Sequence, residues 1–431
     1  MAIEGVVIAF DHDSFEPDPI WTRIDTVCRV SRIEIKRGRQ DEFADVPAGE
    51  ATIFVNDIDG LFDPSNPGSP YFDQLDSRQA AIAIRNPVTD TWSTLFRGVI
   101  DDYGYDLHPS QVVTETAIRL VDGLDYFAGV EVVPGLNGDI SPSPRYVFYE
   151  DANVDDRIIQ VIAETDWPAS RTRIFTGNII VQETTYSPGE SILTVIDDAA
   201  EAEFPGVALR FIDRDGTFIF HGRLARFFPD VVQYDIDRWK AGDGAAILAD
   251  PERAQIRPPF SFQRPRKNII NAALVYPKGI ADADMQGQIV TDAASIAKHG
   301  IRSQSWPELI IKSHVTGTPT GNDECILFGT YFVTNFADPR TRISGITFRS
   351  LRPEDPRADA TWGLICGVEI TDLVDLATSH PGGGGFNEEF YIEGIRYDIS
   401  PLVKDLDSGY PNVTLTLDVS PRAYWVTNLF D

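Results

Sequence analysis

Oxygen-bearing side chains are concentrated in the stretch NDIDGLFDPSNPGSPYF, residues 56–72. Carboxylate and amide oxygens at positions 1, 3 and 5 bind calcium in EF-hand loops, which also need glycine at position 6 and glutamate at position 12. Counted from Asp57, position 3 is Asp59, but position 5 is Leu61 and position 12 is Gly68. The spacing therefore predicts a long turn, in which Asp and Asn side chains bond to nearby backbone groups.

Acidic side chains also occur in adjacent pairs, and two carboxylates can act as acid and base in glycoside hydrolysis. With 66 acidic residues in the chain, adjacent pairs are expected by chance. Examples of such pairs are Asp101–Asp102, Asp155–Asp156 and Asp197–Asp198. The six histidines are scattered, and no G-x-S-x-G elbow or phosphate-binding loop occurs. We therefore expect no catalytic residue, no metal site and no cofactor.

Composition limits the class of protein further. The 431-residue chain carries a net charge of −29, which opposes broad electrostatic binding to nucleic acid but suits a conduit for passing DNA. Its length predicts several domains. Cys28, Cys325 and Cys366 lack C-x-x-C spacing, which argues against a disulfide framework or a zinc site. The first apolar run, residues 5–10, is too short to span a membrane and is predicted to be a strand.

Short strands separated by turn residues dominate the N-terminal part of the chain. Apolar and polar residues alternate through residues 26–39 and 48–60, and residues 80–106 read as two strands joined by the turn NPVTD. This pattern predicts a β-barrel or sandwich at residues 1–130. A Pro/Gly-rich connector follows at residues 131–149.

A smaller α+β domain is predicted at residues 150–260. Ser187 is expected to cap a helix that begins at Pro188, with Glu190 completing a capping box and Pro205–Gly206 ending the helix. A hairpin around the turn Asp213–Gly216 comes next. An earlier helix is expected within residues 155–166.

Strand patterns return at residues 261–422. Residues 362–377 and 389–400 are predicted strands of a closing barrel, and the segments 317–323 and 380–385 are predicted loops. A C-terminal tail, residues 423–431, carries Tyr424, Trp425, Leu429 and Phe430. Two alternatives remain open for it: packing on the chain's own barrel, or docking to a partner in an assembly.

Part of the sequence resembles the N-terminal segment of minor tail proteins of long-tailed phages that infect actinobacteria. The matching residues are Arg37, Gly38, Arg39, Ala48–Ala51, Asn56, Asp59, Gly60, Phe62, Asp63, Pro64, Asn66, Ser69, Pro70 and Tyr71. Residues 190–223 and 367–401 are similar to a helix–hairpin unit and a closing barrel of baseplate hub proteins. One departure is Thr371, which stands where that family usually has glycine.

The resemblance implies a structural protein rather than an enzyme. Its expected fold is mainly β, with two barrel-like hub domains, a smaller α+β insertion and assembly into a trimeric ring. Such a ring would be made in the bacterial host cytoplasm and would lie at the tail tip of the virion. Its partners would be further copies of itself, the distal tail protein or tail tube, and the central fibre or other tip proteins. DNA would only pass through its channel.

Two other classes of protein remain as alternatives. A carbohydrate-binding adhesion module for the host envelope would also be rich in strands and aromatic residues. A tail-associated glycan hydrolase would use one of the carboxylate pairs. Within the resemblance, Asp57, Asp59 and Asp63 are expected to shape the 56–72 turn, and Phe62, Tyr71 and Phe72 to anchor it by burial.

Overall fold

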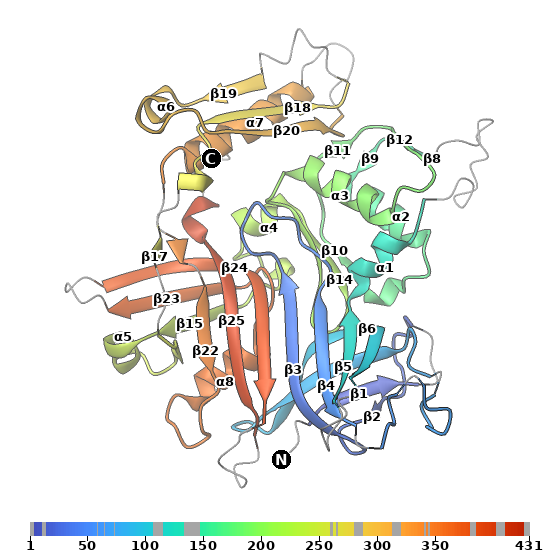
Figure 1. Ribbon diagram of the computed structural model, residues 1–431. Helices are drawn as coiled ribbons and strands as arrows, with labels where there is room; N and C mark the ends of the chain where they lie inside the picture. Colours follow the sequence, from blue (N-terminus) through green and yellow to red (C-terminus); the bar gives the residue numbers. More distant parts are fainter. Residues whose placement is uncertain are drawn as a thin grey trace.

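The structure is a computed structural model of the 431-residue chain, and long strands are its main feature (Figure 1). It describes residues 4–10, 14–57, 59–63, 65–72, 74–106, 115–132, 147–258, 262–263, 266–279, 288–312, 320–339, 342–343, 345–379, 385–401 and 410–425. Within these ranges, no helix is long and apolar enough to cross a membrane.

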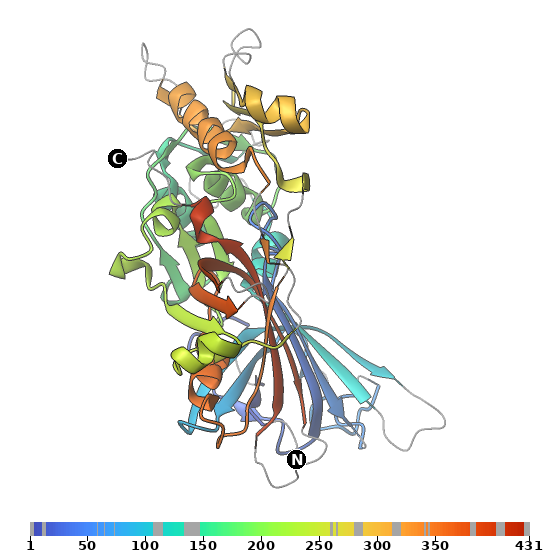
Figure 2. The same cartoon turned by 90° about the vertical axis from the view of Figure 1, so that its left-hand side faces the viewer.

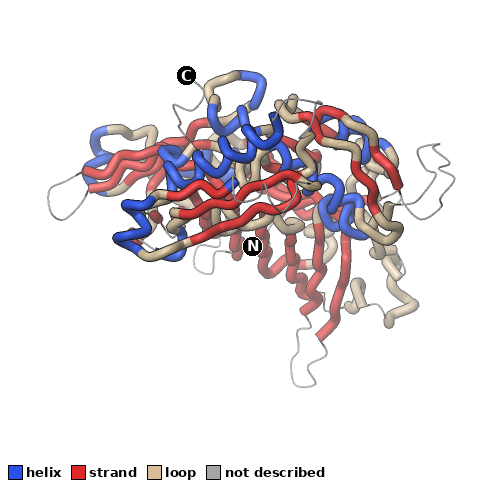
Figure 3. The backbone as a smooth tube through the Cα atoms, turned by 90° about the horizontal axis from the view of Figure 1, so that it is seen from above, coloured by secondary structure: helices blue, strands red, loops and turns tan. Residues whose placement is uncertain are grey.

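The N-terminal strands form one antiparallel run. They are β1 (Val6–Ala9), β2 (Thr22–Arg23), β3 (Arg29–Gly38), β4 (Glu50–Asn56), β5 (Gln79–Asn86), β6 (Thr91–Asp106) and β7 (Glu115–Val121). In β4 the side chains of Ala51, Ile53 and Val55 are buried and alternate with less buried residues, as the period-2 pattern predicts. The paired strands β6 and β7, in the middle of this run, extend away from the helices (Figure 2), and the view from above likewise shows strands reaching beyond the helical part (Figure 3).

Strands from the C-terminal part join the same sheet. They are β15 (Arg238–Gly242), β16 (Ala254–Gln255), β22 (Ile346–Arg349), β23 (Leu373–Ser379), β24 (Gly385–Ser400) and β25 (Asn412–Pro421). β24 pairs with β3 over six residue pairs, from Gly394↔Gly38 to Ile399↔Ile33. In the described part of the chain this gives one 13-stranded sheet, so the two ends of the chain share a continuous hydrogen-bonded structure.

An α+β part lies between these two sets of strands, above the large sheet in Figure 1. Its helices are α1 (Gly123–Gly129), α2 (Val154–Ala163), α3 (Ile192–Glu203) and α4 (Arg223–Phe227). Its strands are β8 (Val147–Tyr149), β9 (Ala152–Asn153), β10 (Thr172–Ile174), β11 (Ile180–Val181), β12 (Thr184–Tyr186), β13 (Leu209–Ile212) and β14 (Phe218–His221). The short helix α5 (Gly244–Ala249) instead lies between β15 and β16 in the chain and packs on β23, at the lower left of Figure 1. The predicted hairpin is confirmed as β13–β14, and Gly216 has φ +80° in its turn.

The predicted start of the α3 helix is wrong by four residues. Ser191, not Ser187, is the N-cap, and its side chain accepts a hydrogen bond from the Thr194 amide at 3.1 Å. Gly189 has φ +95°, which is incompatible with a right-handed helix, so residues 187–190 form a turn before the helix. The predicted stop is confirmed, because Pro205–Gly206 follow directly after the C-cap Phe204.

Two helices replace expected loops and strands in the C-terminal part. α7 (Thr320–Phe336) packs on a small sheet of β18 (Ala272–Pro277), β19 (Ile289–Thr291) and β20 (Ser303–Leu309), and it includes part of the predicted loop 317–323. α8 (Ala358–Gly367) contains the first residues of the predicted strand 362–377. Other elements here are β17 (Phe262–Gln263), α6 (Ala293–His299) and β21 (Arg342–Ile343). Residues 380–384 of the second predicted loop lie outside the described residues, and its last residue, Gly385, begins β24.

The α8 helix was missed because it lacks a polar face. Trp362, Leu364 and Ile365 are all buried although they point in different directions around the helix. A short apolar run without helical periodicity cannot be distinguished from a buried strand by pattern. All three cysteine side chains are buried and unpaired, as their apolar flanking residues predict.

Candidate functional site

The Arg37–Gly38–Arg39 segment ends β3 with a tight change of direction. Gly38 has φ +78°, and a Cβ atom at this position would lie 2.3 Å from the Glu393 carbonyl oxygen. Only glycine avoids both the strained backbone and this clash. The turn allows both neighbouring arginines to enter the protein interior, where Arg37 is 3% exposed and Arg39 is 4% exposed.

Arg37 connects the large sheet to the β13–β14 hairpin. Its Nη1 donates a hydrogen bond to Glu369 Oε1 at 2.7 Å. The other carboxylate oxygen, Glu369 Oε2, accepts from the backbone amide of Arg214 at 2.9 Å. This partly buried ion pair therefore positions the hairpin turn against the segment that precedes β23.

Arg39 belongs to a fully buried charge cluster around Glu393 on β24. Arg39 Nε donates to Glu393 Oε2 at 2.8 Å, and Arg226 Nη1 of α4 donates to Glu393 Oε1 at 2.6 Å. Burial favours a raised pKa for Glu393, but the Arg226 and Arg39 guanidiniums outweigh it and hold that pKa below its usual range. The carboxylate is therefore ionised at neutral pH and pairs with both cations.

Aromatic rings complete the cluster. The Arg226 guanidinium carbon lies 5.1 Å from the Tyr391 ring centroid and 4.8 Å from the Trp425 ring centroid. Trp425 Nε1 donates to Ser420 Oγ, which in turn donates to Glu393 Oε1. The cluster thus joins β3, α4, β24, β25 and the C-terminal segment in one network.

Tyr424 and Trp425 lie inside the protein. They are 1% and 0% exposed, and the Tyr424 carbonyl oxygen accepts a hydrogen bond from the Tyr331 hydroxyl of α7 at 2.6 Å. These two side chains are therefore covered by the chain itself rather than presented to a partner. Leu429 and Phe430 lie outside the described residues, and docking through them stays a prediction.

Acidic side chains in the 56–72 turn bond to the turn's own backbone. Asp57 is 1% exposed, and its two carboxylate oxygens accept from the amides of Leu61 and Phe62, each at 2.7 Å. Asp63 Oδ1 accepts from the Ser65 amide at 2.8 Å. Asp59 is exposed. No group of three His, Cys, Asp or Glu side chains with metal-binding geometry occurs among the residues that the structure describes.

Other motif residues close the same turn. Asn66 Nδ2 donates to the carbonyl oxygen of Gly60, whose φ is +62°. Ser69 Oγ donates to the Leu61 carbonyl oxygen. Asn56 is the last residue of β4, Pro70 is exposed, and Pro64 lies outside the described residues.

Aromatic anchoring of the turn differs in part from the expectation. Phe62 is buried and stacks on Tyr71 with ring centroids 5.3 Å apart, and Tyr71 stacks on Phe10 at 4.8 Å. Phe72, however, is 37% exposed, so the expectation that it anchors the turn by burial is wrong. The Phe10–Tyr71–Phe62 stack anchors the turn instead.

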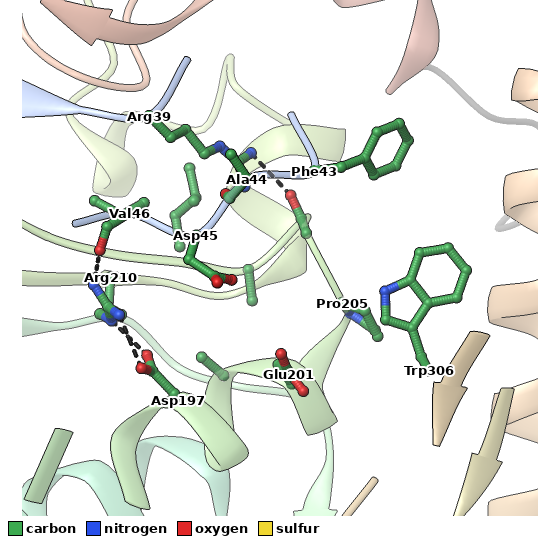
Figure 4. Close-up of a pocket in the computed structure, with 14 residues that line it drawn as sticks. Arg39, Phe43, Ala44, Asp45, Val46, Asp197, Glu201, Pro205, Arg210 and Trp306 are labelled. Atoms are coloured by element: carbon green, nitrogen blue, oxygen red, sulfur yellow. Dashed lines mark hydrogen bonds and ion pairs between the residues drawn. The ribbon is translucent and has the colours of Figure 1, made fainter. Parts of the chain in front are cut away.

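A cavity of about 200 Å³ adjoins Arg39 (Figure 4). Arg210 forms two bonds to Asp197, at 2.5 Å and 2.9 Å, and a third to the Val46 carbonyl oxygen. Both Asp197 oxygens are therefore occupied, and Asp198 accepts from the Tyr186 hydroxyl at 2.9 Å. This carboxylate pair is engaged separately by two partners and is not arranged as an acid and a base across a substrate.

Glu393, Arg226 and Glu369 were not identified as site residues from the sequence. Glu393 is 354 residues from Arg39 and 167 from Arg226 in the sequence, so no local pattern connects them. The one available signal was the segment Ile392–Ile395, which contains this glutamate in the part that is similar to hub proteins.

Comparison with known proteins defines the fold. No family model matches the sequence, and no curated protein matches it significantly. A tail protein from Neisseria meningitidis MC58 aligns over 96% of this chain and 96% of its own, with a TM-score of 0.54 and 10% identity. The 43 kDa tail protein of prophage MuSo2 from Shewanella oneidensis aligns over 96% and 98%, with a TM-score of 0.52 and 12% identity.

At such low identity, this likeness shows a shared fold. The chain therefore shares the mainly β fold of these two tail proteins, which agrees with the mainly β part of the expected fold class. Both neighbours are described as tail proteins. Because the alignments cover nearly the whole of each chain, the likeness concerns the entire architecture rather than one common motif.

Proposed function

We propose that the chain is a structural component of a phage tail tip, related to the minor tail proteins of long-tailed actinobacteriophages. In this role three copies form a hub ring that joins the tail tube to the tip or central fibre and surrounds the DNA channel. The supporting observation is the whole-length match in fold to two tail proteins. The matched motif in residues 37–71 supports the narrower family.

The strand arrangement supports two hub domains in one chain. In this proposal residues 1–130 and 261–422 supply two barrel-like domains, residues 131–149 connect them, and residues 150–260 form the insertion. The β3–β24 pairing and the Arg39–Glu393 ion pair would hold the two domains in a constant relative orientation. A constant orientation is what a closed ring requires, since each interface repeats around the symmetry axis.

Electrostatics suits the same role. Each copy carries a net charge of −29, so a ring of three would present a strongly acidic inner surface if part of this charge faces the channel. Like charge on wall and DNA reduces adhesion during passage. The distal tail protein or tail tube and other tip proteins are the proposed partners. Synthesis would take place in the host cytoplasm.

Antibody labelling of intact virions tests this proposal. Antibodies raised against the purified chain are expected to bind at the distal end of the tail in electron micrographs of a phage lysate. Labelling at the capsid, or chain found in lysate but not in purified virions, would contradict it. Binding of the purified chain to host-envelope glycans, without tail labelling, would favour the adhesion alternative.

A further inference from the structure

A small sheet in the C-terminal part of the chain is covered on one face only. Its strands lie in the order β19, β18, β20, and α7 packs on them. Trp306 of β20 stacks on Phe332 of α7 with ring centroids 4.1 Å apart. A Cβ atom at Gly329 of α7 would lie 3.0 Å from the Val290 side chain and 3.8 Å from Ala273 Cβ. All three strands therefore direct one set of alternating side chains toward this helix.

The opposite face of this sheet is open. Strand register places Ile289 and Ser305 on either side of Leu274. Ile289 is 49% exposed, and Leu274 is half-buried. In Figure 2, α7 lies to the left of these strands, so the open face is turned to the right, the side toward which β6 and β7 extend. The side chains of this open face are Ala272, Leu274, Tyr276, Ile289, Thr291, Ser303 and Ser305.

The open face lacks the charged side chains that meet water on the large sheet. On β3, Arg32, Glu34 and Lys36 alternate with the buried Ile33 and Ile35. None of the seven side chains of the open face is charged, whereas 24% of all residues in the chain are. Protein–protein interfaces are depleted of charged residues at their centre. The open face therefore has the composition of an interface centre rather than of a surface in contact with water.

Charge is distributed unevenly between this part of the chain and the rest. The segment from β17 to β21, residues 262–343, contains nine Lys or Arg and seven Asp or Glu residues, a net charge of +2. The remaining residues, here called the acidic remainder, carry −31. Arg302, which borders the open face next to Ser303, is exposed. Two copies of the chain therefore repel each other least where residues 262–343 of one copy meet the acidic remainder of another.

The exposed side of α2 has the complementary character. Asp156, Ile159, Gln160 and Ala163 are all exposed, and their spacing puts them on one side of the helix, here called the α2 surface. Ile159 is 50% exposed. The α2 surface belongs to the acidic remainder and lies at the right of Figure 1, whereas β19 and α6 lie at the upper left. The open face and the α2 surface are thus separate parts of one copy.

We propose that the open face binds the α2 surface of a second copy of this chain. Leu274 and Ile289 would contact Ile159 at the centre of this interface. Arg302 would pair with Asp156 at the rim. A contact between two different surfaces can repeat from copy to copy, and it closes into a ring when the rotation between copies allows. The inference therefore rests on the proposed hub ring and names the contact that joins its copies.

Sedimentation velocity of the purified full-length chain over a range of concentrations measures this contact. Ile289→Asp and Ile159→Asp each place a charge at its centre, and each is expected to weaken self-association about 10-fold or more. Leu248→Asp is the matched control, because Leu248 of α5 is 88% exposed and belongs to neither surface. The control is expected to change self-association by less than about 2-fold. Unchanged melting temperatures show that the variants are folded, and Ser305→Asp, at an exposed position, replaces Ile289→Asp if that variant unfolds.

A mixture of the two variants tests whether the two different surfaces meet. Each variant keeps one of the surfaces intact, so an equimolar mixture is expected to form pairs with an affinity close to that of the parent chain. A mixture that associates no better than either variant alone would overturn the inference. Equal weakening by Leu248→Asp would also overturn it, because the effect would then come from net charge. A parent chain that stays a single copy at every concentration would contradict it directly.

None of these results would affect the tail-tip location, which virion labelling tests separately. Conversely, virions without tail labelling would contradict the proposed function but leave the measured contact between copies in place.

Discussion

At the residue scale, the matched motif residues are explained by contacts with distant parts of the chain. Arg39, Arg226 and Glu393 are each at most 4% exposed, and one carboxylate serves two guanidiniums. The remaining positive charge is met by the Tyr391 and Trp425 rings and by backbone carbonyl groups such as that of Gly206. The R-G-R segment is therefore a structural connection between the two ends of the chain.

Removal of the Glu393 carboxylate tests this connection. Glu393→Ala leaves two buried guanidiniums without their counter-charge, which is expected to lower the free energy of unfolding by about 3–5 kcal/mol. The matched control is Glu388→Ala, an exposed glutamate on the same strand, which is expected to stay within about 0.5 kcal/mol of the parent protein. Urea unfolding measures both. Similar values for the two variants would show that the cluster contributes little to stability.

Substitutions at two positions with positive φ are expected to have opposite effects on stability. Gly38→Ala adds a Cβ that clashes with the Glu393 carbonyl oxygen and is expected to destabilise by about 1–3 kcal/mol. Thr371 has φ +78° where the resembling family usually has glycine, so Thr371→Gly is expected to stabilise by about 1 kcal/mol. Thermal melting of both variants measures this. A loss of stability in Thr371→Gly would mean that its side-chain packing outweighs the backbone strain.

Asp213 predicts a specific pH dependence. Burial, together with the nearby Glu369 charge, raises the pKa of Asp213 from 3.8 to about 6. Its contribution to stability is therefore complete below about pH 4 and is lost as pH rises toward 6. The side chain in Asp213→Asn cannot ionise, so this variant does not lose stability in this way. Between pH 4 and 7, its free energy of unfolding should rise relative to that of the parent protein by on the order of 1–2 kcal/mol. A difference in unfolding free energy that stays constant over this range would contradict the raised pKa.

At the element scale, local sequence signals predicted strands and turns more accurately than they predicted the helices of the C-terminal part. The alternation in β4 and the Asp213–Gly216 turn have local causes, namely period-2 burial and glycine with positive φ. The α8 helix has no such cause, because it is buried on most sides by tertiary packing. Gly189 shows that the exact start of a helix is harder to predict than the helix itself. The capping pattern from Ser187 to Glu190 predicted a start at Pro188, but the positive φ of Gly189 prevents a helical backbone there, and α3 begins at Ile192.

The hydrogen bonds in the 56–72 turn lead us to expect that calcium does not change the stability of the protein. Both Asp57 oxygens accept backbone hydrogen bonds, and Asp63 caps the following turn, so these carboxylates already have donors. Treatment with EDTA is expected to leave the melting temperature unchanged to within about 1 °C, a shift that corresponds to well under 1 kcal/mol. A clear decrease that added calcium reverses would instead establish a cation site in this turn.

At the scale of the whole molecule, the pairing of β24 with β3 could not be predicted from the sequence. Strand patterns identified β3 and β24 individually, but their pairing joins residues more than 350 positions apart. The mainly β fold class was nevertheless predictable, because it depends on the number and spacing of strands rather than on their partners. The same continuous sheet gives the hub proposal its physical basis, since it joins both proposed hub domains.

Imaging of the purified chain at high concentration, with no symmetry imposed, is the most direct test of the proposed hub. The account predicts particles with threefold symmetry and a central hole, and a particle mass three times that of the 47.8 kDa chain. Glu393→Ala, which loosens the connection between the proposed hub domains, should reduce the fraction of closed rings. Compact single copies at every concentration, alone and with purified tail tubes, would contradict the account.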